Sequence, residues 1–152
     1  MTDPLDLFEA EHDVALAALT RLETAALALR RGDNPDVHFA VARDVHLLLT
    51  GPVRWHNEKE EAALFPELGE DAPLGPFRDE HQTLWRLEED LHNALAAGDG
   101  QRVARVSLDI VELLRAHIER ENQALFPLAR ERLGPLGLLR VAERLAQYRG
   151  TS

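Results

Sequence analysis

The sequence predicts an all-α fold, an antiparallel up-down four-helix bundle with a short extra helix at its C-terminal end. Alanine and leucine dominate the composition, β-branched residues are sparse, and turn signals fall about every 30 residues. Between the turns, apolar residues recur at helical spacing, which is typical of helices that bury one face. Because the connections are short, successive helices should run antiparallel.

The first predicted helix begins at Asp3 and ends near Arg31. Asp3 is a good N-cap residue, Pro4 suits the first helical position, and Gly32 follows the last turn. This combination of a capped start and a glycine stop indicates a helix that uses the whole segment. Its apolar face carries Phe8, Ala15, Leu19 and Leu22.

The second predicted helix runs from about Asp36 to about Leu68, and Thr50-Gly51-Pro52 interrupts it. Proline lacks the backbone N–H that a helix interior uses, so we expect a kink or a break at this tripeptide. The apolar face of the second helix carries Leu49, Val53, Ala63 and Leu64.

The third predicted helix follows a loop at Pro73–Pro76 and ends near Ala97, where Gly98-Asp99-Gly100 marks a turn. Its apolar face carries Phe77, Leu84, Leu91 and Leu95. Each of these residues recurs at a spacing that brings it back to the same side of a helix.

The fourth predicted helix runs from about Gln101 to about Arg132, and Gly134-Pro135 ends it. The segment from Leu136 to Tyr148 is expected to form the short extra helix, packed on the end of the bundle. The apolar face of the fourth helix carries Val106, Ile110, Leu113 and Leu128.

Length and composition limit the possible functions. The 152 residues suit one domain over 1–152, and cysteine is absent, which excludes disulfides, thiolate metal sites and a cysteine nucleophile. The net charge is −10 and basic residues do not cluster, so neither nucleic acid nor an anionic membrane is an expected partner. The acidic N-terminus lacks a signal-peptide pattern and no uncharged apolar run approaches about 18 residues, so we expect a cytoplasmic protein.

Histidine and glutamate occupy positions on the apolar faces where polar residues are costly. Two of the helices carry a glutamate four residues after the histidine, which places the two side chains on one face and one turn apart. A buried carboxylate is expensive unless it is paired or binds a metal ion. The residues at these positions are His12, His56, Glu60, His81, His117 and Glu121.

The pattern occurs twice along the chain. Glu11-His12 is followed by His56-x-x-x-Glu60 and then by Leu64-Phe65-Pro66, and Glu80-His81 is followed by His117-x-x-x-Glu121 and then by Leu125-Phe126-Pro127. A single histidine on an apolar face is usually a hydrogen-bonded core residue. Two copies of one helix pair instead predict a shared, pseudo-twofold site at the centre of the bundle.

Imidazole and carboxylate ligands together suit iron, manganese or zinc. Six ligands from four helices exceed what one tetrahedral zinc ion takes. They suit two ions, each with two histidines, with Glu60 and Glu121 bridging them as in carboxylate di-iron bundles. Each ion would then keep open positions for dioxygen, peroxide, nitric oxide, water or an oxo or hydroxo bridge.

From His12 to Pro127 these motifs resemble the hemerythrin-like family, also called the HHE cation-binding domain. The doubled H-x-x-x-E followed by L-F-P carries the resemblance. It implies an antiparallel four-helix bundle that holds two iron ions with an oxo or hydroxo bridge. It also implies that this centre reacts reversibly with dioxygen or related small molecules.

The sequence departs from the oxygen-carrying members of that family at two places. Those proteins place two histidines four residues apart on the third helix, whereas the neighbours of His81 at this spacing are Phe77 and Trp85. They also carry an aspartate five residues after the histidine of the fourth helix, where this chain has Asn122, so the resemblance makes Glu121 the ligand. The missing imidazole opens a coordination position and favours oxidation, peroxide chemistry or nitric oxide binding over simple oxygen carriage.

Three hypotheses for the function remain open at this point. The first is a di-iron protein that binds or senses dioxygen or a related diatomic molecule or peroxide. The second is an enzyme that uses the same centre for peroxide breakdown or nitric oxide reduction, and the third is a metal-buffering or zinc-binding module. We find no acid–base pair beside the predicted ligands that would indicate catalysis. We expect the remaining histidines to lie on the surface or at the bundle ends; they are His38, His46 and His92.

Overall fold

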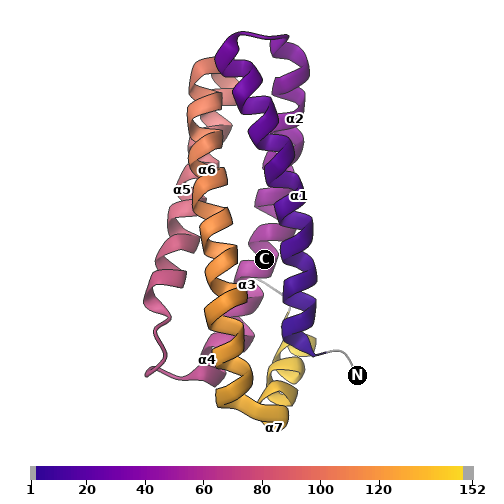
Figure 1. The fold of residues 1–152 in the computed structure, drawn as a ribbon, viewed down its shortest axis with the longest axis vertical. Coiled ribbons are helices and arrows are strands. Elements are labelled where there is room, and N and C mark those ends of the chain that lie inside the picture. Colours follow the sequence, from indigo (N-terminus) through magenta and orange to yellow (C-terminus); the bar gives the residue numbers. More distant parts are fainter. Residues whose placement is uncertain (1–2, 149–152) are drawn as a thin grey trace.

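The computed structural model describes residues 3–148, and within this range it contains helices and no strands (Figure 1). Two of the four long helices are the unbroken α1 (Pro4–Arg31) and α5 (Gly75–Ala97). The other two contain π-helical turns. The second consists of α2 (Pro35–Leu48), η1 (Leu49–Val53), α3 (Arg54–Lys59), η2 (Glu60–Leu64) and α4 (Phe65–Leu68), and the fourth of α6 (Gly100–Arg120), η3 (Glu121–Leu125) and α7 (Phe126–Gln147).

The long helices pack as an antiparallel bundle. Helix α1 packs against α2 and α6, and α5 packs against the same two helices from the other side. Figure 1 shows each long helix running opposite to the one that precedes it in the chain. The predicted up-down four-helix bundle is therefore confirmed.

Local signals set most helix ends. Asp3 caps α1, since its Oδ1 accepts the N–H of Leu5 at 2.7 Å, and Gly32 closes the helix in the left-handed conformation with φ 81°. The second and fourth long helices each begin one residue before the predicted start. Asp99 caps α6 by accepting the N–H of Arg102 at 3.1 Å.

Three π-helical turns interrupt the long helices. The predicted interruption at Thr50-Gly51-Pro52 is confirmed and takes the form of η1. The other two, η2 and η3, were not predicted, and each is followed at once by a Phe-Pro pair that ends in Pro66 or Pro127. Proline cannot donate to the carbonyl four residues earlier and its ring clashes with it, which favours a wider turn just before the proline.

The fourth long helix ends at Gly134, as predicted, which lies within the segment labelled α7, and the rest of α7 is a second helical segment. Gly134 has φ 61° and ψ −173°, a conformation that only glycine adopts readily, and the chain reverses there (Figure 1). The returning segment is joined to α4, since Arg140 and Arg144 both donate to the Glu67 carboxylate, at 3.0 and 2.9 Å. It buries Val141 and partly buries Leu138 and Leu145, so the predicted extra helix on the end of the bundle is confirmed.

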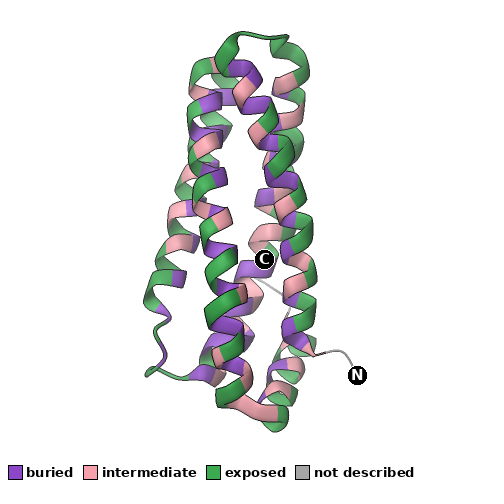
Figure 2. Ribbon diagram, in the orientation of Figure 1, coloured by how far each residue is buried: buried purple, intermediate pink, exposed green. Residues whose placement is uncertain are grey.

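Buried residues form two apolar clusters along the bundle (Figure 2). On α1, Phe8 belongs to one cluster and Ala15 to the other, so His12 lies between them. Leu113 and Leu128, expected in the core, are only partly buried, and the neighbouring Leu114 and Ala129 are buried instead. For Ala129, the extra residue of η3 moves the buried face by one position. Within residues 3–148, no helix is long and apolar enough to cross a membrane.

Candidate metal centre

The six polar residues that the sequence singled out come together between the two apolar clusters. Their side chains form two groups of four, and both groups contain Glu60 and Glu121. None of the six residues is more than 5 % exposed. The first group adds His12 and His56 to the two glutamates, and the second adds His81 and His117.

The Glu121 carboxylate lies between imidazoles from the two halves of the chain. Its Oε1 is 2.9 Å from His12 Nε2, and its Oε2 is 3.3 Å from His117 Nε2. The two carboxylate oxygens therefore face different histidine pairs, which is the arrangement of a group that joins two sites.

The Glu60 carboxylate holds the matching position on the opposite side. Its Oε1 is 3.3 Å from His56 Nε2 and 3.6 Å from His81 Nε2. The Nε2 atoms of His81 and His117 are 3.2 Å apart. The imidazole nitrogens and carboxylate oxygens thus converge on one small region.

The two carboxylates lie at the beginning of the two π-helical turns η2 and η3. Glu60 is the first residue of η2, and Glu121 is the first residue of η3. Four residues earlier on the same helices lie His56 and His117, so each pair projects from one face of its helix. Because the wider turn begins at the glutamate, the residues after it are shifted in register while the His-Glu pair is not.

Each imidazole is held from behind through its Nδ1 atom. His56 Nδ1 donates to Glu11 Oε1 at 3.0 Å, and His117 Nδ1 donates to Glu80 Oε1 at 3.0 Å. A carboxylate can only accept, so the bond assigns the proton to Nδ1 and directs Nε2 towards the centre. This is the usual support for a metal-binding histidine.

The other two imidazoles also donate through Nδ1 to side-chain oxygens, one to a carboxylate and one to an amide. His81 Nδ1 donates to Glu61 Oε2 at 3.1 Å, and His12 Nδ1 donates to Asn122 Oδ1 at 2.7 Å. Glu11, Glu61 and Glu80 thus each support one imidazole of the cluster through its Nδ1 atom. Asn122 was not expected in this role, although it follows Glu121 as Glu61 follows Glu60.

Cations and aromatic rings complete the surroundings of the imidazoles. Lys59 pairs with Glu11 at 2.8 Å, and Arg120 pairs with Glu80. Although burial opposes it, these pairs and the histidines hold the pKa of both carboxyls below the usual range. Phenylalanine rings pack on all four imidazoles: Phe8 on His56, Phe77 on His117, Phe126 on His12 and Phe65 on His81.

Several buried polar atoms of the centre make no hydrogen bond with any other described residue. They are His56 Nε2, both carboxylate oxygens of Glu60, and Glu121 Oε2. Leaving such atoms unsatisfied costs about 1–3 kcal/mol each. A bound cation would satisfy all of them, so the donor set fits two metal ions that share the carboxylates.

The family comparison agrees with this geometry. The model of the family described as Hemerythrin HHE cation binding domain matches residues 3–129. The chain belongs to this family. No curated protein and no solved structure matched the chain significantly. As an HHE cation-binding domain, the protein carries a buried His/Glu cluster consistent with a binuclear metal site.

The charges within the hemerythrin-family centre shift the pKa values of its groups. Burial lowers the pKa of the His56 imidazole, but Glu60 and Glu11 outweigh burial and raise it to about 10. Burial also opposes the rise at His81, where Glu60 and Glu61 bring the pKa to about 9. For Glu60, burial favours the neutral form, yet the facing imidazoles hold its pKa well below the ordinary value. Metal ions must therefore displace protons from the imidazoles.

The histidines that the sequence placed outside the centre lie outside both groups. His92 is exposed, and His38 and His46 are half-buried. His46 on α2 and His92 on α5 face each other, with ring centroids 5.8 Å apart. The roles of the six central residues as metal ligands stay a prediction, which the following section develops.

Proposed function

We propose that this hemerythrin-family protein binds two iron ions and that the centre binds or senses dioxygen or a related small molecule, such as peroxide or nitric oxide. His12 and His56 would hold one ion, and His81 and His117 the other. Glu60 and Glu121 would bridge the two ions. When bound, the iron pair supplies reversible redox and ligand-binding chemistry.

The observation that carries this proposal is the sharing of both carboxylates by the two ligand groups. A single metal ion would leave one histidine pair without an ion, whereas two ions use all six residues. The Glu60 carboxylate supports the same conclusion, because both of its buried oxygens lack a hydrogen bond and its Oε1 lies near histidines of both halves. The Nδ1 bonds to Glu11, Glu61, Glu80 and Asn122 leave every Nε2 available for a metal ion.

The choice of iron rests on the donor set. Four imidazoles and two carboxylates, with no cysteine in the chain, suit iron, manganese or zinc and disfavour copper(I) and iron–sulfur clusters. Membership in the hemerythrin family favours iron among these three. A ligand set with two histidines per ion leaves coordination positions free for a small molecule, which supports binding or sensing.

The test is metal content together with the visible spectrum of protein purified in air, then reduced and exposed again to oxygen. Two irons per chain and charge-transfer bands that change reversibly with oxygen are the expected result. Repeated turnover of peroxide or nitric oxide would replace sensing with the enzyme hypothesis. Zinc in place of iron, with no visible bands, would contradict the proposed redox function and favour a metal-buffering module.

A further inference from the structure

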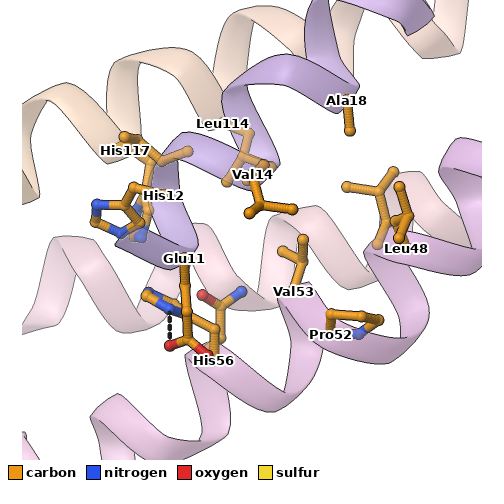
Figure 3. Close-up of a pocket in the computed structure, with 14 residues that line it drawn as sticks. Glu11, His12, Val14, Ala18, Leu48, Pro52, Val53, His56, Leu114 and His117 are labelled. Atoms are coloured by element: carbon orange, nitrogen blue, oxygen red, sulfur yellow. Dashed lines mark hydrogen bonds and ion pairs between the residues drawn. The ribbon is translucent and has the colours of Figure 1, made fainter. Parts of the chain in front are cut away.

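An apolar cavity lies directly beside the metal centre, between α1, the η1 and α3 segments, and α6 (Figure 3). Its volume is about 190 Å³. His12, His56 and His117 line it, and Figure 3 shows these imidazoles at one end and apolar side chains at the other. A molecule in the cavity would therefore contact the outer edge of the centre.

The cavity exists because small side chains on α1 face a π-helical turn. Ala15 and Ala18 line the α1 wall and leave space that larger residues would fill. Leu48, Pro52 and Val53 form the opposite wall, at and next to η1. Figure 3 shows Ala18 and Leu48 at the end of the cavity away from the imidazoles.

The cavity reaches the surface between α1 and η1. Val14 lines it and is 62 % exposed, and Pro52, on the other side of the opening, is also exposed. A ligand can therefore enter without separation of the long helices. The opening is bordered by apolar groups, so it favours uncharged molecules over ions.

The volume is larger than a diatomic ligand needs. A dry apolar cavity of about 150 Å³ is enough to bind benzene, and one water molecule occupies about 30 Å³ in the liquid. At about 190 Å³, this cavity matches an organic molecule of benzene size or somewhat larger. Its lining by alanine, valine, leucine, isoleucine and proline gives that molecule apolar contacts on most sides.

Besides His56 Nε2, which faces the metal centre, a second polar atom of the cavity wall makes no hydrogen bond within the described residues. Asn57 is 2 % exposed, and its Nδ2 makes no hydrogen bond with any residue between 3 and 148. The nearby Glu11 carboxylate is already used by His56 and Lys59. An amide nitrogen only donates, so the polar group that would complement this wall is an acceptor oxygen on the ligand.

We propose that the cavity binds an uncharged, mainly apolar organic molecule that carries one oxygen, with this oxygen accepting a hydrogen bond from Asn57. The ligand class is a small aromatic or branched aliphatic ketone or alcohol. The site lies beside the metal centre and goes beyond the proposed function, because its binding forces come from the cavity walls and Asn57. The metal ions are not needed to hold the molecule.

Two probes of almost equal shape test the proposal. Acetophenone carries a carbonyl oxygen, and α-methylstyrene has a methylene group in its place. Each is titrated into the full chain, metal-free and zinc-loaded, and followed by the NMR shifts of backbone amides and of the Asn57 side-chain amide. We expect saturable shifts at the cavity residues with both probes, and affinity for acetophenone about fivefold higher.

Three variants locate the binding and the hydrogen bond. Ala18→Leu fills the cavity and should abolish binding of both probes, whereas Ala17→Leu adds the same side chain at an exposed position of α1 and should bind both normally. Asn57→Ala should weaken the binding of acetophenone by about fivefold and leave the binding of α-methylstyrene unchanged. Helical circular dichroism checks each fold, and Leu48→Phe, at a half-buried wall position, replaces Ala18→Leu if that variant does not fold.

The opposite results would overturn the proposal. Absence of saturable shifts at the cavity residues, or equal binding by Ala18→Leu and the unsubstituted chain, would exclude an organic ligand here. An equal loss of affinity for both probes in Asn57→Ala would exclude the assigned hydrogen bond. The metal content of the protein as purified separates the two proposals. Purified protein that lacks iron but binds both probes would contradict only the proposed function, and purified protein that holds two irons but binds neither probe would contradict only the cavity ligand.

Discussion

The two halves of the metal centre are built from the same contacts in the same order. Glu11 accepts from His56 and pairs with Lys59, while Glu80 accepts from His117 and pairs with Arg120. In both halves, the supporting glutamate is the residue just before the histidine of α1 or α5. The cation is the residue just before the glutamate that begins η2 or η3. The repeated spacing along the chain therefore repeats the Glu–His and Glu–cation contacts between helices, in addition to the six predicted ligands.

The halves differ at one supporting position. His81 donates to the carboxylate of Glu61, whereas His12 donates to the neutral amide oxygen of Asn122. A carboxylate partner makes an imidazole a stronger electron donor than an amide partner does. In the proposed di-iron centre, this difference would make the two ions inequivalent, with the ion at His81 and His117 held more tightly.

The largest effect is expected at the residues that the two halves share. Glu60→Gln and Glu121→Gln should each lose both ions, because each carboxylate belongs to both groups, whereas His12→Ala should first lose the ion of its own half. Metal content by mass spectrometry after gel filtration measures this. His92→Ala, an exposed histidine outside both groups, is the control and should keep both ions. Loss of one ion only in Glu60→Gln would contradict the bridging role.

The next effect concerns the position at which the halves differ. Asn122→Asp should tighten the ion at His12 and His56 by about tenfold, and Glu61→Gln should weaken the other ion by about tenfold, since supporting partners change metal affinity by roughly 10–100-fold. Competition with a chelator at fixed pH measures the two affinities. Glu119→Gln is the matched control because Glu119 is exposed and bonds only to Gln123 among the described residues. Equal affinities in the unsubstituted chain would refute the inequivalence.

A smaller effect is expected on the stability of the metal-free protein as the pH rises. The pKa of His56 in the folded protein, about 10, lies above the ordinary histidine value of 6.5. Its stabilisation is therefore fully present below pH 6.5 and is lost as the pH rises towards 10. Thermal unfolding of metal-free protein should show a melting temperature about 5 °C lower at the alkaline end. His56→Gln should make this slope shallower, and an unchanged slope would show that the imidazole is not protonated in the metal-free fold.

The smallest effects are expected where each half ends its Phe-Pro helix. Gly69 has φ 85° and ψ 172°, and Gly134 has φ 61° and ψ −173°, conformations open mainly to glycine. Alanine at either position should reduce the free energy of unfolding by about 1–3 kcal/mol through backbone strain, since no atom lies within 4 Å of the added Cβ. Urea unfolding measures both variants. Gly75→Ala, where φ is negative and the Cβ also meets open space, should be close to neutral. A loss as large at Gly75 would point to a cause other than strain.

Helix ends were predictable where the signal is local. Asp3 and Gly32 bound α1, and Gly98 closes α5, because caps and left-handed glycines act within one turn of the chain. The π turns at Glu60 and Glu121 were missed. The following prolines favour a wider turn, but whether the helix kinks, breaks or takes in an extra residue depends on how its two sides pack in the bundle.

The repeated histidine and glutamate pattern also allowed the members of the buried polar cluster to be predicted. Their positions on the apolar faces predicted one buried cluster, and the six side chains lie together as expected. The bond from His12 to Asn122 was not predicted, because it joins residues 110 positions apart on α1 and η3. Spacing along one helix says nothing about which residue of another helix lies behind an imidazole.

The sequence by itself determined the helices, the antiparallel order, and the identity of the polar residues that had to be buried together. Periodicity and capping depend on residues that are close in the chain, so they can be recognised from the sequence. Only the tertiary structure decided which groups support each imidazole, which oxygens remain unsatisfied, and that a cavity opens beside His12 and His56. These features depend on the distances between packed helices, which are set by all the side chains at once.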